Sequence, residues 1–390
     1  MNNIKLVSDT IDKQDIQKLV QWLSADEIPR LTKGEKTLEF ESKWSNWLGV
    51  HHTTYVNSGS SAILLALAAL KELGIKNNKV VVPTLSWLTD VSSVMQLGMQ
   101  PVLVDCNLLD LSVDLEMLEE TFIKESPAVF ILVSVLGLVP NMKKIVELCK
   151  KYDVKLIEDV CESMGSKFNN QKLGTFGDVG LFSLYYGHHL STIEGGLICT
   201  KNSDLHWIIN AMRSHGWDRD WPKERQTQFR QKHNVAPFDS LYTFYYPGFN
   251  VRATDLQAFL GLSQIDKIDT FAEKRNRNFH LYLTKLPYNM LRINENKSDF
   301  VSNFAFPYMS KNRTKIVSEL QLAGVEIRPL IAGSLGSKPF WYERYGKIEM
   351  PNADKINELG FYLPNHQDLT PENIELITKI INTIELQGNL

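Results

Sequence analysis

Two adjacent histidines, His188 and His189, follow an apolar stretch at 179–184 and precede the glycines Gly195 and Gly196. An apolar run that gives way to a polar turn is typical of a buried strand that ends at the turn. Histidine has an unperturbed pKa of about 6.5, so an imidazole at this place can accept and return a proton near neutral pH. These residues predict acid–base chemistry at the turn, without deciding between the two side chains.

A small-residue turn at 57–62, NSGSSA, opens directly onto an apolar helical pattern. Free backbone N–H groups and the positive end of the helix dipole make such a turn a seat for phosphate. Gly59, Ser60 and Ser61 are the candidates, with the serine hydroxyls adding donors. The same residue types are good helix N-caps, so phosphate binding and simple capping both stay open.

A carboxylate, Asp159, ends the apolar stretch at 155–160. A carboxylate in such a place is costly unless it meets a cation or hydrogen-bond donors. A protonated heterocyclic nitrogen is one suitable partner, and a helix cap or an internal salt bridge is the alternative. Ser183 ends a neighbouring apolar stretch, and Trp87 follows another and offers a flat face on which a ring can stack.

Short apolar stretches rich in β-branched residues predict the strands that position these side chains, and amphipathic patterns between them predict helices. Strands that are apolar on both faces and separated by helices favour a mostly parallel sheet covered on both sides. Ligands of such sheets bind beyond the carboxyl ends of the strands, where the polar residues above are expected to meet. The predicted strands are 79–83, 101–105, 128–135, 155–160, 179–184 and 196–200, and the predicted helices include 60–73, 141–153 and 203–214.

The remainder of the chain has a different pattern. Residues 205–250 are aromatic and charged, which predicts that they pack against something rather than form a solvated linker. A helical pattern at 253–283 follows, and the residues from about 300 onward resemble a small α+β unit. We therefore expect a large domain over 1–250 and a small C-terminal domain over 251–390.

Composition excludes several classes of protein. The 390 residues carry a formal net charge of −3, which gives no basic footprint for nucleic acid. The N-terminal residues have no apolar core of signal-peptide length, and no apolar run is long enough to span a membrane, so we expect a cytoplasmic protein without membrane contact. The spacing of the four cysteines fits no zinc or cluster motif, which predicts free thiols and no metal.

Seven motifs in a fixed order carry a resemblance to a known family: SGSSA, PTLSW, IEDVCESMG, GTFGDVGLFSL, EGG, RSHGW and GFNVRATDLQAFLG. Together they resemble the sugar aminotransferases of the DegT/DnrJ/EryC/StrS type. The resemblance implies an α/β protein with the aspartate aminotransferase fold (fold type I), a mostly parallel central sheet and a smaller C-terminal α+β domain. It also implies pyridoxal phosphate as cofactor, a nucleotide-linked keto-sugar as substrate, and a homodimer whose active sites are shared between subunits.

The resemblance also implies roles for individual residues. Asp159 would pair with the pyridine nitrogen, Trp87 would stack on the ring, and Glu162 would lie under the hydroxyl region of the cofactor. Asn250 would reach the cofactor phosphate of the neighbouring subunit. Gly59, Ser60, Ser61 and Ser183 would bind the phosphate, and His215, Arg219 and Arg328 are candidates for substrate contacts, with ordinary surface charge as the alternative.

One position departs from the family. The family has a lysine there that bonds covalently to the cofactor, and this chain has His188, while Lys172 and Lys201 lie off the motif. Imidazole forms no stable imine, so pyridoxal or pyridoxamine phosphate would be held non-covalently and His188 would act as acid and base. By the same resemblance, His189 occupies a position where asparagine is common and has a supporting or structural role.

The change from lysine to histidine resembles the sugar 3-dehydratase branch of the family. It implies loss of the C3 hydroxyl from GDP-linked 4-keto-6-deoxymannose, with L-glutamate as the amine donor, and the GDP assignment depends on the resemblance alone. A related branch with a [2Fe-2S] centre needs a cluster-type cysteine pattern that this chain lacks. A nucleotide-sugar aminotransferase and a cofactor-binding pseudoenzyme or regulator of the same fold remain as alternatives.

Overall fold

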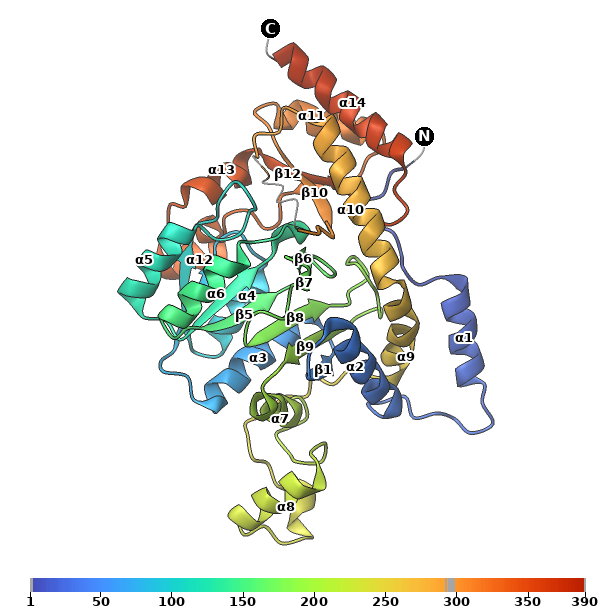
Figure 1. Cartoon of the computed structure of the whole chain (residues 1–390), viewed down its shortest axis with the longest axis vertical. Helices are drawn as coiled ribbons and strands as arrows, with labels where there is room; N and C mark the ends of the chain where they lie inside the picture. The colour runs from blue at the N-terminus through green and yellow to red at the C-terminus, as the bar shows by residue number, and fades with distance from the viewer. Residues whose placement is uncertain (1–2, 292, 294–298, 389–390) are drawn as a thin grey trace.

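The structure is a computed structural model that describes residues 3–291, 293 and 299–388. Its centre is a seven-stranded sheet in the order β1-β9-β8-β5-β4-β2-β3 (Figure 1). Only β9 runs antiparallel to its two neighbours in this sheet. The strands are β1 (His52–Val56), β2 (Lys79–Pro83), β3 (Gln100–Val104), β4 (Val129–Val133), β5 (Lys155–Asp159), β8 (Val179–Ser183) and β9 (Gly196–Thr200).

The strand predictions are confirmed to within a few residues at the ends, and so is the mostly parallel sheet. The sequence pattern does not predict β1, which closes one edge of the sheet by pairing with β9. Side chains alternate between the faces of a strand, and here both faces are buried. Val80 and Val82 contribute to one hydrophobic core and Val81 contributes to the other, so helices must cover the sheet on both sides.

The covering helices lie on the two faces of the sheet (Figure 1). Helices α3 and α7 contact the face of β9, and α2 packs on β1 and on α9. The helices of this part of the chain are α2 (Glu35–Leu48), α3 (Gly59–Leu73), α4 (Leu88–Gln96), α5 (Leu115–Glu125), α6 (Met142–Lys151), α7 (Ser203–Met212) and α9 (Asp255–Gln264). The short hairpin is β6 (Lys167–Phe168) with β7 (Gln171–Lys172).

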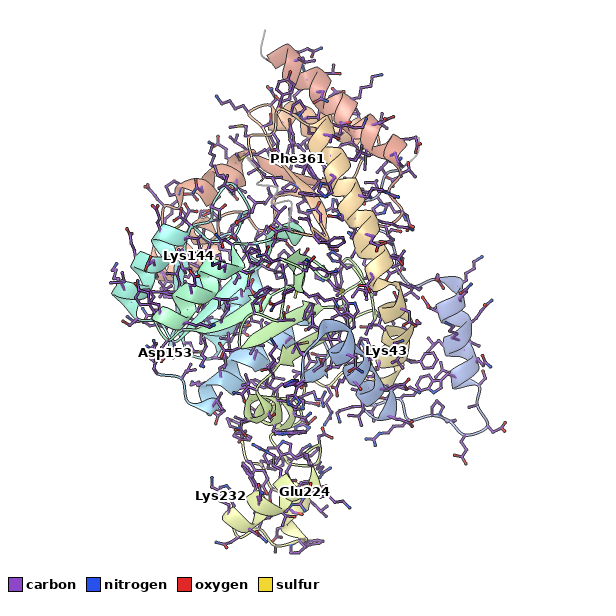
Figure 2. All side chains as sticks on the ribbon, viewed as in Figure 1. Lys43, Lys144, Asp153, Glu224, Lys232 and Phe361 are labelled. Carbon is purple, nitrogen blue, oxygen red and sulfur yellow. The ribbon has the colours of Figure 1, made fainter. Side chains whose placement is uncertain are left out.

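A second, antiparallel sheet in the order β10-β12-β11 forms the C-terminal part, where Figure 2 labels Phe361. Its strands are β10 (Ala305–Met309), β11 (Arg328–Pro329) and β12 (Gly360–Pro364). The strand predicted from VEIRPL is therefore only two residues long. The associated helices are α10 (Ile268–Lys285), α11 (Arg313–Leu322), α12 (Pro339–Tyr345), α13 (Pro351–Leu359) and α14 (Pro371–Gly388).

The expected division of the chain at residue 250 stays a prediction. Near the N-terminus, Ile4 pairs with Val325 of the C-terminal part. Helix α1 (Lys13–Leu23) instead lies beside α9, where the rings of Trp22 and Phe259 stack at 4.6 Å.

The aromatic segment after α7 forms an arm that extends from the body of the protein and carries α8 (Lys223–Lys232) (Figure 1). Figure 2 labels Glu224 and Lys232 on this arm. Part of the segment packs on itself, since Trp221 and Tyr245 stack at 5.7 Å. Phe238, in contrast, is 82% exposed. The prediction that this segment packs is thus only partly met within one subunit.

A buried ion pair ties the edge of the large sheet to two helices. Arg213, which follows α7, is fully buried and donates to Glu41 of α2 and to the carbonyl of Tyr55 in β1. The same Glu41 oxygen accepts the Tyr55 backbone N–H at 2.7 Å. Among the described residues, no helix has the length and apolar character needed to cross a membrane.

Candidate active site

The carboxyl edge of the large sheet brings together several of the residues that the sequence singled out. Asp159 and Ser183 are the last residues of the adjacent strands β5 and β8, and Trp87 lies four residues beyond β2. Trp87 is 58% exposed, which is unusual for so large an apolar residue and leaves its indole accessible at this edge.

The turn at 57–62 lies tightly against the ends of two strands. A Cβ on Gly59 would come within 2.8 Å of the Ser183 Cβ, and one on Gly196 would come within 2.2 Å of the Ser58 carbonyl oxygen. Both positions therefore require glycine. Ser58 is the N-cap of α3, because its Oγ accepts the backbone N–H of Ser61 at 3.0 Å.

The capping interpretation thus applies to Ser58, which leaves Gly59, Ser60 and Ser61 in the first turn of α3. Apart from the Ser61 N–H, which Ser58 accepts, N–H groups in the first turn have no partner within the helix, and the helix dipole makes this end positive. With Ser183 against Gly59, the arrangement fits a phosphate group.

Three carboxyl groups meet a short distance away. Asp159 accepts the backbone N–H of Cys161 at 2.9 Å, and Glu162 accepts that of Leu136 at 2.8 Å. Burial, with a contribution from the Asp159 charge, raises the pKa of Glu162 to about 8. Asp90, which sequence analysis missed, has its pKa raised well above the ordinary value by burial and then by Asp159.

The main influences on the pKa values of Asp90 and Glu162 include no lysine or arginine. Buried carboxylates without a cation are costly, so this end of the site favours a cationic ligand group. A protonated pyridine nitrogen near Asp159 meets that need.

His188 lies at the turn after β8, half-buried between two aromatic rings. Its ring centroid is 5.9 Å from that of Tyr185 and 5.5 Å from that of Phe304. Burial, followed by the positive charge of Arg275, lowers the pKa of His188 to about 4. The imidazole is therefore neutral at pH 7, which is the form that can accept a proton.

His189 points into the protein instead. It is 2% exposed, and its Nε2 lies 2.9 Å from the Ser302 carbonyl oxygen. Because a carbonyl oxygen only accepts, Nε2 carries the proton and donates. This geometry supports the structural role expected for His189.

Neither off-motif lysine belongs to this group of residues. Lys172 donates to the Trp47 carbonyl and lies 4.4 Å from the centre of the Trp47 ring. Lys201 donates to the Thr175 carbonyl at 2.8 Å. Both line a surface pocket beside the C-terminal end of α2.

The C-terminal part contributes two aromatic residues that sequence analysis did not single out. Phe304 contacts His188, and its ring centroid is 6.3 Å from that of Tyr362 in β12. Burial, together with the charge of Glu162, raises the pKa of Tyr362 to about 12, while Arg328 acts in the opposite direction. Arg328 pairs with Tyr362 across β11 and β12, is exposed, and donates to the Ile327 carbonyl at 3.0 Å.

The substrate candidates His215 and Arg219, and the cofactor candidate Asn250, lie around the base of the arm. The Arg219 guanidinium is 3.8 Å from the centre of the Trp217 ring and donates to the Leu241 carbonyl. The His215 ring lies 5.0 Å from that of Trp217. Asn250 is exposed and pairs with Ser214. These contacts connect the three candidates to the arm rather than to Asp159.

The site therefore has a seat for phosphate, an exposed indole face, an acidic end without a cation, and a neutral imidazole. Pyridoxal phosphate has a phosphate, a flat ring and a basic ring nitrogen, so the residues present fit it. Among the described residues, no group of three or more histidine, cysteine or acidic side chains is arranged to hold a metal ion. All four cysteines are free thiols.

Comparison with known proteins gives a family match over most of the chain. The profile of the DegT/DnrJ/EryC1/StrS aminotransferase family matches residues 9–382. GDP-4-keto-6-deoxy-D-mannose 3-dehydratase of Escherichia coli O55:H7 is 30% identical, and the alignment covers 98% of this chain and all of the relative.

Solved structures give the same result. A mutant GDP-4-keto-6-deoxymannose-3-dehydratase with bound GDP-perosamine superposes with a TM-score of 0.87 at 29% identity, covering 97% of this chain and 100% of that one. A second structure of a GDP-4-keto-6-deoxymannose-3-dehydratase, with a trapped PLP-glutamate geminal diamine, has the same TM-score, identity and coverage.

Proposed function

The chain belongs to the DegT/DnrJ/EryC1/StrS aminotransferase family, and we propose that it catalyses the 3-dehydration of GDP-4-keto-6-deoxy-D-mannose. The product would be a GDP-linked 4-keto-3,6-dideoxy sugar. Pyridoxal or pyridoxamine phosphate would be the non-covalently bound cofactor and L-glutamate the amine donor. The enzyme is then a lyase with an aminotransferase half-reaction.

The observation that carries the proposal is a neutral histidine, His188, at the strand end where a cofactor-bonding lysine is expected. Among the described residues, its Nδ1 is buried without a hydrogen-bond partner. The nearby lysines, Lys172 and Lys201, are engaged elsewhere. With neither of these lysines at the turn, the described site would move protons through His188 and hold the cofactor without an imine, which favours elimination over ordinary amino transfer.

Several residues would hold and orient the cofactor. The first turn of α3, with Ser60, Ser61 and Ser183, would bind the phosphate through N–H and O–H donors. Asp159 would keep a proton on the ring nitrogen, and Trp87 would cover one face of the ring. When bound, the cofactor supplies an electron sink for charge that develops at the adjoining carbon.

His188 would move the proton that the elimination requires. The neutral imidazole would accept a proton from the cofactor carbon that carries the amino group. The resulting imidazolium would donate that proton to the departing oxygen at C3 of the sugar, which leaves as water. Because the folded protein lowers the pKa of His188, the imidazolium is a strong acid in this place and gives up the proton readily.

The partners of this reaction are part of the proposal. Arg328, which pairs with Tyr362 in the small sheet, would contact the substrate from that side. His215 and Arg219 would contact it near the base of the arm. The exposed aromatic residues of the arm, including Phe238, support a homodimer in which Asn250 reaches the neighbouring active site. We propose a cytoplasmic location, where nucleotide sugars and glutamate are available.

One incubation tests the function against both alternatives. Protein, pyridoxal phosphate, glutamate and GDP-4-keto-6-deoxymannose should yield 2-oxoglutarate together with a dideoxy ketone. An amino sugar formed in step with 2-oxoglutarate, with no dideoxy ketone, would show an aminotransferase. Bound cofactor without turnover would instead show a pseudoenzyme.

A further inference from the structure

A buried hydrogen bond joins the turn after β8 to the N-terminal segment, residues 4–12. The Oγ1 of Thr10 accepts the backbone N–H of Ser191 at 3.0 Å, and the two residues are 3% and 1% exposed. Ser191 lies three positions beyond His188 in the same turn. The bond therefore connects the proposed base to a part of the chain 181 positions away, to which the proposed chemistry assigns no role.

The N-terminal segment is itself held on both sides of Thr10. Before Thr10, the carbonyl oxygen of Ile4 accepts the backbone N–H of Glu326 at 2.9 Å. After it, Lys267 donates to the Thr10 carbonyl at 3.2 Å and forms an ion pair with Asp15 of α1 at 2.6 Å. Figure 1 shows the segment running from the C-terminal part of the protein to α1. Thr10 is thus a fixed point for the turn.

Ser191 transmits this support to the part of the turn that needs it. The ends of the turn are closed by backbone bonds, since Leu184 donates to Gly195 at 2.9 Å and accepts the Thr192 N–H at 3.0 Å. Between them, Ile193 has a φ of +70°, which is costly for a β-branched residue. The Ser191 Oγ accepts the Ile193 N–H at 3.0 Å. A strained conformation of this kind persists only where the surrounding contacts fix it.

The placement of the His188 imidazole depends on the backbone of this turn. The ring packs between Tyr185 and Phe304, and its Nδ1 is buried with no hydrogen-bond partner in the described part of the chain. A general base must come within about 3 Å of the proton that it accepts. A small displacement of the turn would therefore lower the rate of proton transfer without removing the imidazole.

We propose that Thr10 is a positioning residue, which accepts the Ser191 N–H and thereby fixes the turn that presents His188 to the cofactor. Loss of the acceptor leaves a buried N–H unpaired and favours a displaced turn. The other bonds of the turn remain, so the effect should be smaller than that of removing the imidazole. This inference rests on the role of His188 in the proposed function, but the anchor itself can be tested without any reaction.

Three substitutions separate positioning from a general loss of stability. Thr10→Val removes the acceptor and keeps a β-branched side chain, whereas Thr10→Ser keeps the hydroxyl. Thr200→Val is the matched control at the far end of β9: Thr200 is 3% exposed, and its Oγ1 accepts the Asn202 N–H at 3.1 Å and donates to the Asp178 carbonyl. Both valine variants should lower the urea midpoint. Thr10→Ala, which also lacks the acceptor, replaces Thr10→Val if that variant does not fold.

The first experiment measures hydrogen–deuterium exchange of the protein without cofactor. Relative to peptides of β5, the peptide that contains Ser191 should exchange about tenfold faster in Thr10→Val, as expected for the loss of one buried hydrogen bond. Thr10→Ser and Thr200→Val should keep the slow exchange of the unmodified protein. Unchanged exchange in Thr10→Val would overturn the anchor and, with it, the positioning role.

The second experiment measures the single-turnover rate of sugar dehydration and the affinity for pyridoxal phosphate. Thr10→Val should lower the rate about tenfold and change cofactor affinity less than about twofold, because the phosphate seat and the acidic end are untouched. Thr10→Ser should recover most of the rate, and Thr200→Val should match the unmodified protein. A purely structural role predicts equal rates for the two valine variants while both are folded.

An unchanged rate in Thr10→Val, or an equal loss in Thr200→Val, would refute the positioning role. If the unmodified protein binds the cofactor and does not dehydrate the sugar, the proposed function fails and the role of Thr10 in that reaction fails with it. Faster exchange confined to Thr10→Val would still show that Thr10 anchors the turn, so the two failures can be told apart.

Discussion

Replacing His188 by asparagine tests the proposed mechanism most directly. The imidazole contacts Tyr185 and Phe304 and lies outside the phosphate seat and the acidic end, so cofactor affinity should change less than about threefold, equivalent to about 0.6 kcal/mol. Loss of a positioned acid–base group lowers a rate by about 10²–10⁴-fold. We expect the dehydration rate of His188→Asn to fall by at least about 10²-fold, because asparagine can act neither as the base nor as the acid.

The pH dependence provides the second part of this test. A pKa of about 4 leaves His188 almost entirely neutral at pH 7. In the unmodified enzyme, the single-turnover rate of sugar loss should therefore be nearly constant from pH 8 to about pH 5 and fall tenfold per unit below the pKa. Product can be followed by chromatography of the nucleotide sugars.

His189→Asn is the matched control for this experiment. His189 donates to the Ser302 carbonyl inside the protein, so its loss should lower stability and leave dehydration within tenfold of the unmodified rate. Turnover of His188→Asn within tenfold of the unmodified enzyme would refute the assignment of the base. If the dehydration rate of the unmodified enzyme falls around pH 6.5, burial does not lower the pKa of His188 as described.

Three further predictions concern a covalent bond to the cofactor, the buried ion pair of Arg213 and the buried His206. His188→Lys should form an imine with pyridoxal phosphate and lose dehydration activity. Borohydride should reduce this imine, so that the protein mass rises by that of the bound cofactor. An unchanged protein mass would count against the placement of residue 188 at the cofactor. Arg213→Met should lower the free energy of unfolding by about 3–5 kcal/mol, because it leaves the buried Glu41 carboxylate without its cation. Lys151→Met is the control: it removes an exposed ion pair with Glu119 and should leave the midpoint of urea unfolding nearly unchanged. Burial lowers the pKa of His206 to about 3 in the folded protein. Below pH 6.5 the unfolded chain therefore binds a proton that the folded protein does not, and the free energy of unfolding falls as the pH is lowered toward 3. His206→Gln should reduce this fall by up to about 1.4 kcal/mol per pH unit, and the same dependence of unfolding free energy on pH in both proteins, measured by urea titration from pH 6 to 4, would contradict it.

The strands that position the site could be predicted from sequence because each is a short apolar run bounded by polar turns. The sequence pattern does not indicate β1 because His52, Thr53 and Thr54 are polar residues. Thr53 and Thr54 become buried because β1 pairs with β9 and is covered by α2 and α7. Likewise, β11 is short because its pairing with β12, and not the apolar pattern, decides where the strand ends.

The placement of Trp87, Asp159 and Ser183 at one edge followed from the rule for parallel sheets. The same reasoning applied to Asp90, an acidic residue three positions after Trp87, could have drawn attention to it. Phe304 could not have been found in this way, because its contact with His188 joins segments that are distant in sequence.

In the proposed function, a histidine at position 188 can stand where the family has a lysine only if surrounding residues take over what the covalent bond provides. A cofactor without a covalent bond must be held at both ends. In the proposed function, the first turn of α3 would hold the phosphate and the acidic residues around Asp159 would hold the ring nitrogen. Burial by Phe304 and the charge of Arg275 make His188 a weak base and, once protonated, a strong acid. Such a group favours the step in which a proton is delivered to a leaving hydroxyl, and this is the step that distinguishes a dehydratase from an aminotransferase.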